Sequence, residues 1–323
     1  MTIRTSSMWS PPDGVICSCN VGARLLLVTL LLIAGCASAT NVDAVLQKHR
    51  DKAIAVAFYD LRDGRTFYRN EREVFHAAST MKVPVMLGIF EAVSRGALRL
   101  DQQVRVRNEF TSIFDGSPYV LDPKDDSDNE MYKIIGREVP LEYLVRRMIV
   151  RSSNLATNNV IELIGAKQVM SLIKRIGAND IQVLRGVEDQ KAYDHGMNNT
   201  TTAYDLMLVF RAVVSSPKMM DILAAQEFNS AIPAGLPRGT RVAHKTGDIT
   251  KIAHDAGIVF RPDGSAYVLV VLTRGFAKLA DANHVIAEIS RAVWRANERA
   301  SSPPGAPPRY RSWISRGTPV RPR

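Results

Sequence analysis

The chain has 323 residues, of which 46% are apolar and 23% charged, a composition that excludes wholesale disorder and allows one large domain or two interleaved ones. The formal charge is +10, but residues 301–323 contribute five Arg and no acidic residue, so the body is only mildly basic. A charge that small does not indicate a phosphate-binding face, and no nucleic-acid partner is expected. All three cysteines lie within the first 36 residues, which excludes a disulfide framework or a cysteine-based metal site in the body.

The first 35 residues predict a signal peptide. Residues 25–35 read LLLVTLLLIAG after Arg24, a run too short for a bilayer span of about 20 residues but suited to a signal h-region. The sequence from Ile33 to Cys36 resembles a bacterial lipobox, so we expect a lipid on Cys36 and a membrane-anchored protein facing the periplasm or cell exterior. Ordinary cleavage after Ala39 is the alternative, and it would release a soluble exported protein.

Apolar periodicity then predicts a strand hairpin, a helical middle, a second set of strands and a final helix. The expected strands are 53–60 and 65–69, then 240–248, 255–261 and 266–273. The expected helices are 79–96, 141–164, 166–176, 202–214 and 281–297. Polar, turn-rich sequence predicts long loops over 111–136 and 180–200, and the Pro- and Arg-rich residues 298–323 are expected to be disordered.

This order predicts an α/β (α+β sandwich) fold, in which one antiparallel sheet is built from both ends of the chain and flanked by helices. The catalytic domain would cover residues 36–297, with an α/β part over 45–78 and 215–297 and an all-α insertion over 79–214. We expect a monomer.

Ser79-Thr80-Met81-Lys82 is an S-x-x-K motif at the start of an expected helix. Positions i and i+3 share a helix face, so the Lys82 amine can reach the Ser79 hydroxyl, and the helix N-terminus favours negative charge there. A buried ammonium loses its proton easily, which allows Lys82 to act as a base. By itself the motif is weak, since Ser171-Leu172-Ile173-Lys174 repeats it within what we interpret as an ordinary amphipathic helix.

Lys245-Thr246-Gly247 occurs once, at the end of an apolar strand. Glycine there allows a ligand backbone to approach, and the threonine hydroxyl can bind a carboxylate. Between these two motifs lies Ser152-Ser153-Asn154, at a break between helical stretches, with Asn158 one turn later. The literal Ser127-Asp128-Asn129 lies in a polar loop without helical surroundings, so we reject it. Helix capping is the alternative role for Ser152 and Asn154.

The order S-x-x-K, S-x-N, K-T-G resembles the motif set of class A β-lactamases and penicillin-binding proteins. The resemblance covers about residues 45–297 and includes FHAASTMKVPV, RSSNLATNNVIELIG and LPRGTRVAHKTG. It implies a serine hydrolase with a β-lactamase/transpeptidase-like fold. In such an enzyme Ser79 is the acylated nucleophile, Lys82 its base, and Ser152 a proton relay assisted by Lys245.

The resemblance also implies the ligand contacts. Asn154 would hold the amide side chain of the substrate, Asn158 would lie beside it, and Thr246 would bind the carboxylate. The backbone N–H groups of Ser79 and Asp248 would form the oxyanion hole.

The sequence departs from class A in the segment that supports deacylation. The corresponding loop reads RGVEDQKAYDHGMNNTTTAYDL and contains no E-x-x-L-N. Glu188 is the best candidate for the base that activates water, with Asp189 and Asp194 behind it, although a salt bridge from Glu188 to Arg185 would serve equally to pin the loop. Ser153 also stands where S-D-N has an aspartate, and Asp248 places a carboxylate beside an anion site.

Three functions therefore stay open. The first is hydrolysis of β-lactams through an acyl-enzyme whose deacylation is either efficient or slow. The second is a D,D-peptidase-like, penicillin-binding activity on peptidoglycan peptides. The third is a non-catalytic, ligand-binding lipoprotein. Neither a cofactor nor a metal is implied, because His244 and His254 flank the K-T-G strand at non-adjacent positions and form no cluster of metal ligands.

Overall fold

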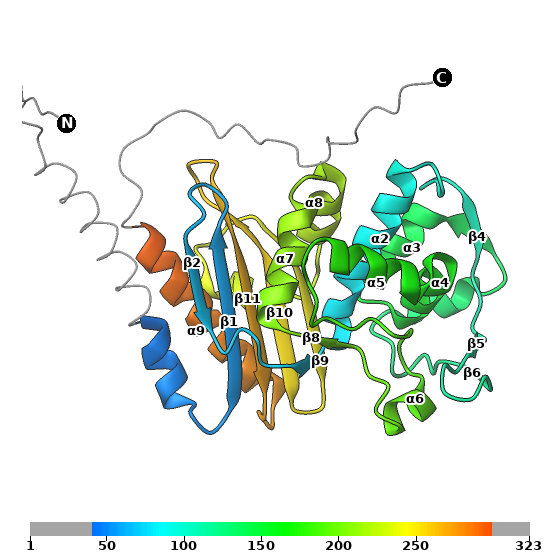
Figure 1. The fold of residues 1–323 in the computed structure, drawn as a ribbon, viewed down its shortest axis with the longest axis horizontal. Coiled ribbons are helices and arrows are strands. Elements are labelled where there is room, and N and C mark those ends of the chain that lie inside the picture. Colours follow the sequence, from blue (N-terminus) through cyan, green and yellow to red (C-terminus); the bar gives the residue numbers. More distant parts are fainter. Residues whose placement is uncertain (1–40, 299–323) are drawn as a thin grey trace, which may run out of the picture.

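The computed structural model describes residues 41–298. Cys36, the signal segment 1–35 and nearly all of the predicted tail lie outside the described residues. Within them a five-stranded antiparallel sheet has the order β2-β1-β11-β10-β9 (Figure 1). The strands are β1 (Ala53–Asp60), β2 (Thr66–Arg69), β9 (Val242–Ile249), β10 (Ile252–Phe260) and β11 (Ala266–Arg274). The sheet thus joins both ends of the chain, as predicted.

Each face of the sheet buries a separate apolar cluster. Val56, Phe58 and Val271 face the helix α9 (Leu279–Glu298), together with residues from a helix over 41–48. Ala57 and Val270 face the opposite side, where the helical part of the chain packs. Because successive side chains of a strand point to opposite faces, strands covered on both sides are apolar throughout, and β11 has only one exposed residue. Figure 1 shows α9 on one side of the sheet and α7, α2 and α5 on the other.

The helical part lies between β2 and β9 in the chain. Its longer elements are η1 (Ala78–Met81), α2 (Lys82–Ser94), α3 (Leu141–Val150), α4 (Asn154–Ile164), α5 (Ala166–Arg175), α7 (Ala203–Val213) and α8 (Pro217–Ala224). Shorter ones are η2 (Asn129–Ile134), α6 (Gln190–Asp194) and η3 (Ile232–Gly235). Two-stranded pairs join β3 (Phe75–His76) to β8 (Thr200–Thr201), β4 (Gln103–Arg105) to β7 (Glu138–Pro140), and β5 (Phe110–Thr111) to β6 (Pro118–Tyr119).

The differences from the sequence prediction are local. The expected helix 141–164 is divided at residues 151–153, because Ser152 adopts a positive φ that a right-handed helix cannot include. The helix over 41–48 and α8 were not predicted. For α8 a signal exists, since Ser216 caps the helix through Met219 N–H and Pro217 occupies its first turn. No helix within residues 41–298 is long and apolar enough to cross a membrane.

Candidate active site

Ser79 lies at the junction between the sheet and the helical part. It belongs to η1, which follows β3 and leads directly into α2. Ala78 before it has a φ of +45°, one of five positive-φ non-glycine residues in the described chain. Two others, Ser152 and Glu188, belong to the same site. Strained backbone of this kind is typical of functional sites, because the surrounding structure must hold it in place.

Lys82 begins α2 and is fully buried. Its Nζ donates to Ser152 O at 2.6 Å and to Asn154 Oδ1 at 2.8 Å, and it lies 3.3 Å from Ser152 Oγ. Three acceptors from the turn between α3 and α4 therefore surround one amine. Among the described residues the Lys82 amine makes no hydrogen bond to the Ser79 hydroxyl, and the i, i+3 spacing of the motif is what relates the two side chains.

The turn between α3 and α4 presents Ser152 to both lysines. Ser153, not Ser152 or Asn154, is the N-cap of α4, and its Oγ accepts Ala156 N–H at 3.1 Å. Because Ser153 makes the capping bond, the side chains on either side of it are available to the site. Asn154 uses its Oδ1 on Lys82 and its Nδ2 on Glu188.

The third motif reaches the site from β9, the edge strand of the sheet. Lys245 Nζ donates to Ser152 Oγ at 3.0 Å and to Thr246 O at 2.8 Å. Ser152 Oγ thus lies between the amines of Lys82 and Lys245. A Cβ on Gly247 would come within 2.7 Å of Ser79 N and 2.8 Å of Thr80 N, so only glycine allows β9 to pass this close to the nucleophile.

The edge position of β9 matters for ligand binding, because backbone groups on its outer side have no strand partner within residues 41–298. Ser79 N and the strand meet at Gly247, which places the two backbone segments predicted for the oxyanion hole next to each other. Thr246 is half-buried and Asp248 exposed, consistent with positions at the wall and mouth of a cleft.

Burial sets the charge of the two lysines. Removal from water lowers the pKa of Lys82 to about 8, while the carboxylates of Asp126, Glu188 and Asp248 act in the opposite direction. Burial also lowers the pKa of Lys245 well below its ordinary value, and the neighbouring Lys82 adds to the effect. A lysine with a pKa near 8 has a usable fraction of free amine at neutral pH, which a general base requires.

Glu188 reaches the site from the loop over residues 180–200. Its Oε1 accepts Asn154 Nδ2 at 2.6 Å, and burial raises the pKa of its carboxyl. The alternative role as a salt-bridge partner of Arg185 is wrong. Arg185 donates to the backbone oxygens of Met197 and Gly186, at 2.9 and 3.0 Å, and it forms no ion pair with any acid among residues 41–298.

The two acidic residues behind Glu188 have other surroundings. Asp189 is buried as the N-cap of α6, and its carboxylate also accepts from Ser112 Oγ and Ile113 N–H. Asp194 is exposed at the end of α6 and accepts from Gln190. Glu188 is therefore the one acid of this loop, among the described residues, with a side-chain bond to the lysine–serine network.

Asn158 has a different position from the one expected for a substrate contact. It is 1% exposed, its Oδ1 accepts Val187 N–H at 2.7 Å, and its Nδ2 donates to Val187 O at 3.0 Å. Both ends of the amide are thus used on the backbone next to Glu188. The structure corrects the expectation: Asn158 holds the loop that carries Glu188.

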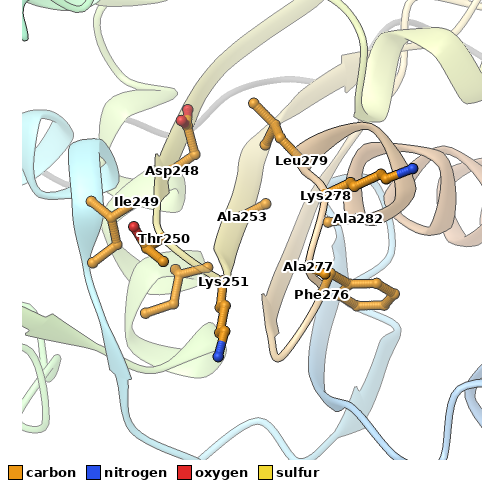
Figure 2. Close-up of a pocket in the computed structure, with 11 residues that line it drawn as sticks. Asp248, Ile249, Thr250, Lys251, Ala253, Phe276, Ala277, Lys278, Leu279 and Ala282 are labelled. Carbon is orange, nitrogen blue, oxygen red and sulfur yellow. The ribbon is translucent and has the colours of Figure 1, made fainter.

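A separate cavity of about 250 Å³ adjoins the site at Asp248. It lies between the β9–β10 turn and the start of α9, and Phe276 and Leu279 form much of its apolar wall (Figure 2). Lys251 and Lys278 point to different sides of it. Ser79, Lys82 and Ser152 are not among its lining residues, so this cavity is separate from the lysine–serine network beside β9.

Two of the histidines, His244 and His254, are buried and hydrogen-bonded. His244 Nδ1 lies 2.9 Å from Asp255 Oδ1, and His254 Nε2 lies 2.9 Å from His76 O. Within residues 41–298 no group of three or more His, Cys, Asp or Glu is arranged to hold a metal ion.

Comparison with known proteins now places this site in a family. A family model described as the Beta-lactamase enzyme family matches residues 37–296. The chain belongs to this family. The β-lactamase VEB-1 of Pseudomonas aeruginosa is 23% identical over 300 residues, which cover 84% of this chain and 96% of VEB-1.

Solved structures agree with the family. A β-lactamase from Sphaerobacter thermophilus is 25% identical, with a TM-score of 0.68 over 83% of this chain and 98% of its own. A point variant of PBP-A, solved as an acyl-enzyme complex with penicillin G, is also 25% identical, with a TM-score of 0.68 over 81% and 96%. The predicted β-lactamase/transpeptidase-like fold is confirmed, and the family is one of hydrolases acting on β-lactams.

Proposed function

We propose that this chain is a class A-like serine β-lactamase that opens the β-lactam ring through an acyl-enzyme on Ser79. One observation carries the proposal: a buried lysine with a pKa of about 8 and a second buried lysine share Ser152 Oγ directly beside the nucleophile helix. Such an arrangement can remove a proton from one hydroxyl and deliver it to a leaving group through another.

In the acylation step the free amine of Lys82 takes the Ser79 hydroxyl proton as Ser79 Oγ attacks the lactam carbonyl. The resulting oxyanion is stabilised by the N–H groups of Ser79 and Asp248. When the C–N bond breaks, Ser152 Oγ–H protonates the departing nitrogen, and Lys82 returns its proton to Ser152. Lys245 stabilises negative charge on Ser152 Oγ during this exchange, from 3.0 Å.

The fixed contacts of the site suggest how a ligand lies. Thr246 offers a hydroxyl to the substrate carboxylate, and β9 pairs with the amide side of the ligand as an added strand. Asn154 reaches the same side, although its amide is already bonded to Lys82 and Glu188 in this structure.

In the deacylation step Glu188 is the general base. Its carboxylate takes a proton from the water that attacks the ester of Ser79, and this proton passes from Glu188 to Ser79 Oγ as the ester C–O bond breaks. The carboxylate is tied to Asn154 and comes from a loop without the class A pattern, so we propose that this step is slow.

The same observation supports a second candidate. If Glu188 does not activate water, the acyl-enzyme persists, and the chain is a penicillin-binding enzyme of the D,D-peptidase type acting on peptidoglycan peptides. The likeness to PBP-A, solved as an acyl-enzyme, is compatible with this candidate. A lipid anchor on Cys36 and a place at the membrane, facing the periplasm or exterior, would suit either enzyme.

Intact-mass spectrometry over time, with benzylpenicillin and with a cephalosporin, tests the proposal. We expect a transient adduct on Ser79 and accumulating hydrolysed product. A persistent adduct without product would instead support the penicillin-binding enzyme. Absence of both adduct and product would overturn both enzymatic functions and leave a ligand-binding role.

A further inference from the structure

The middle position of the second motif lacks its usual charge. Where the pattern S-D-N has an aspartate, this chain has Ser153, which caps α4 but brings no carboxylate. A carboxylate nevertheless lies at this place. It belongs to Asp126, which lies before η2 within the polar loop predicted over 111–136.

Asp126 is 8% exposed and is held by donors only. Its Oδ2 accepts Leu155 N–H at 2.8 Å, Tyr132 OH at 3.2 Å and Ser153 Oγ–H at 3.4 Å. Its Oδ1 accepts Asp128 N–H at 3.0 Å. Because each partner donates, the ionised carboxylate fits this environment.

Two of these bonds act on the first turn of α4. Leu155 and Ser153 flank Asn154, whose Oδ1 is a ligand of the Lys82 amine. Within residues 41–298 no Lys, Arg or His lies within 4 Å of the Asp126 carboxylate. The negative charge is therefore not neutralised by direct contact with a surface cation.

We propose that Asp126 is a positioning residue that supplies, from outside the motif, the carboxylate of S-D-N, and that it fixes the start of α4 and the charge balance around Lys82. This inference rests on the proposed function, because the main experiment measures the acylation of Ser79. It assigns a positioning role to the loop whose literal Ser127-Asp128-Asn129 was rejected as the second motif.

The electrostatics agree with the geometry. Among the groups that raise the pKa of Lys82 against the effect of burial, Asp126 acts most strongly, ahead of Glu188 and Asp248. The other charged groups around this cluster are Asp125 and Asp128 in the same loop, Arg147 on α3, Arg151 after it and Lys245 on β9.

The test measures the second-order rate of Ser79 acylation by benzylpenicillin from pH 6 to pH 9.5. Asp126→Asn removes the charge, and Asp125→Asn removes the same charge from an exposed neighbour as the matched control. We expect Asp126→Asn to lower the maximal rate at least tenfold and to move the pH midpoint to lower pH, because the anion that favours charged Lys82 is gone. Asp125→Asn should leave both unchanged.

A relocation variant separates charge from packing. Asp126→Ser alone is compared with Asp126→Ser combined with Ser153→Asp, which returns the carboxylate to the middle of the motif and keeps an acceptable N-cap. The double variant should acylate Ser79 at least tenfold faster than Asp126→Ser does. An unmoved pH midpoint in Asp126→Asn, or a double variant no faster than Asp126→Ser, overturns the inference. If Asp126→Asn does not fold, the comparison of the double variant with Asp126→Ser decides the question by the recovery of the acylation rate. A double variant that does not fold also overturns the inference.

Failure of the proposed function can be distinguished from failure of the Asp126 inference. If the wild type forms no adduct, thermal unfolding replaces acylation as the readout. Asp126→Asn should then lose more Tm at pH 6, where Lys82 is charged, than at pH 9, where it is largely neutral. Equal losses at both pH values would show a purely structural role and overturn the inference.

Discussion

The site has two halves that the chain builds in different ways. Around Ser79, three segments distant in sequence bring Lys82, Ser152 and Lys245 together through side-chain bonds of 3.3 Å or less. On the other side of Asn154, Glu188 has one side-chain bond, and its loop is held at Val187 by Asn158.

The difference shows what each reaction demands. Acylation needs a nucleophile, a base and a proton relay in a fixed mutual geometry, which short motifs on rigid elements provide. Deacylation needs a carboxylate that can orient one water, and a loop can bring that group from several positions. Sequence motifs are therefore strict in the first half and relaxed in the second.

The largest effect is expected in the acylating half. Ser79→Ala should abolish the penicillin adduct, because the only proposed nucleophile is removed. Ser171→Ala, in the second S-x-x-K of the chain, is the matched control and should form the adduct at the wild-type rate. Intact mass after mixing measures both, and an adduct on Ser79→Ala would show that acylation takes place elsewhere.

The second effect isolates the deacylating half. Glu188→Gln should form the adduct at a rate close to that of the wild type but release it about 100-fold more slowly, a typical loss for a general base. Asp194→Asn, an exposed acid of the same loop, should behave like the wild type. Burst and steady-state kinetics separate the two steps; equal release rates in Glu188→Gln and wild type would exclude Glu188 as the base.

The third prediction separates acylation from deacylation by their different dependence on pH. Acylation needs uncharged Lys82, so its rate should rise with pH through the pKa of about 8, by about tenfold between pH 7 and pH 9. Deacylation needs ionised Glu188, whose pKa is raised by burial, so it should fall only as the pH drops through that raised value. Single-turnover rates across the pH range measure both limbs. An acylation rate independent of pH above 7 would argue against Lys82 as the base.

The smallest effect concerns the support of the loop. Asn158→Ala removes both bonds to Val187 and should slow deacylation several-fold while costing about 1–3 kcal/mol of unfolding free energy. Asn159→Ala is the matched control, since Asn159 is also buried and bonds the backbone of Arg107 instead. It should lose similar stability without a specific loss of deacylation, as measured by thermal unfolding and adduct decay. Equal deacylation rates in Asn158→Ala and Asn159→Ala would show that Asn158 does not help to position Glu188.

The sequence by itself determined the sheet, most helices and the motif residues around Ser79. These features are local: alternation marks a strand, spacing of three and four marks a helix, and S-x-x-K fixes one helix face. The break at Ser152 was also visible as a polar interruption between apolar helical stretches, although the capping role of Ser153 was not.

Only the tertiary structure decided how the remaining polar groups are used. Asn158 looks like any helical asparagine until Val187 is placed against it, and Glu188 is bonded to Asn154 across 34 positions of sequence. Asp126 lies in a polar loop with several other acids, and nothing local distinguishes it. Its role depends on burial beside α4, because a carboxylate acquires a strong effect on a distant amine only where water is excluded.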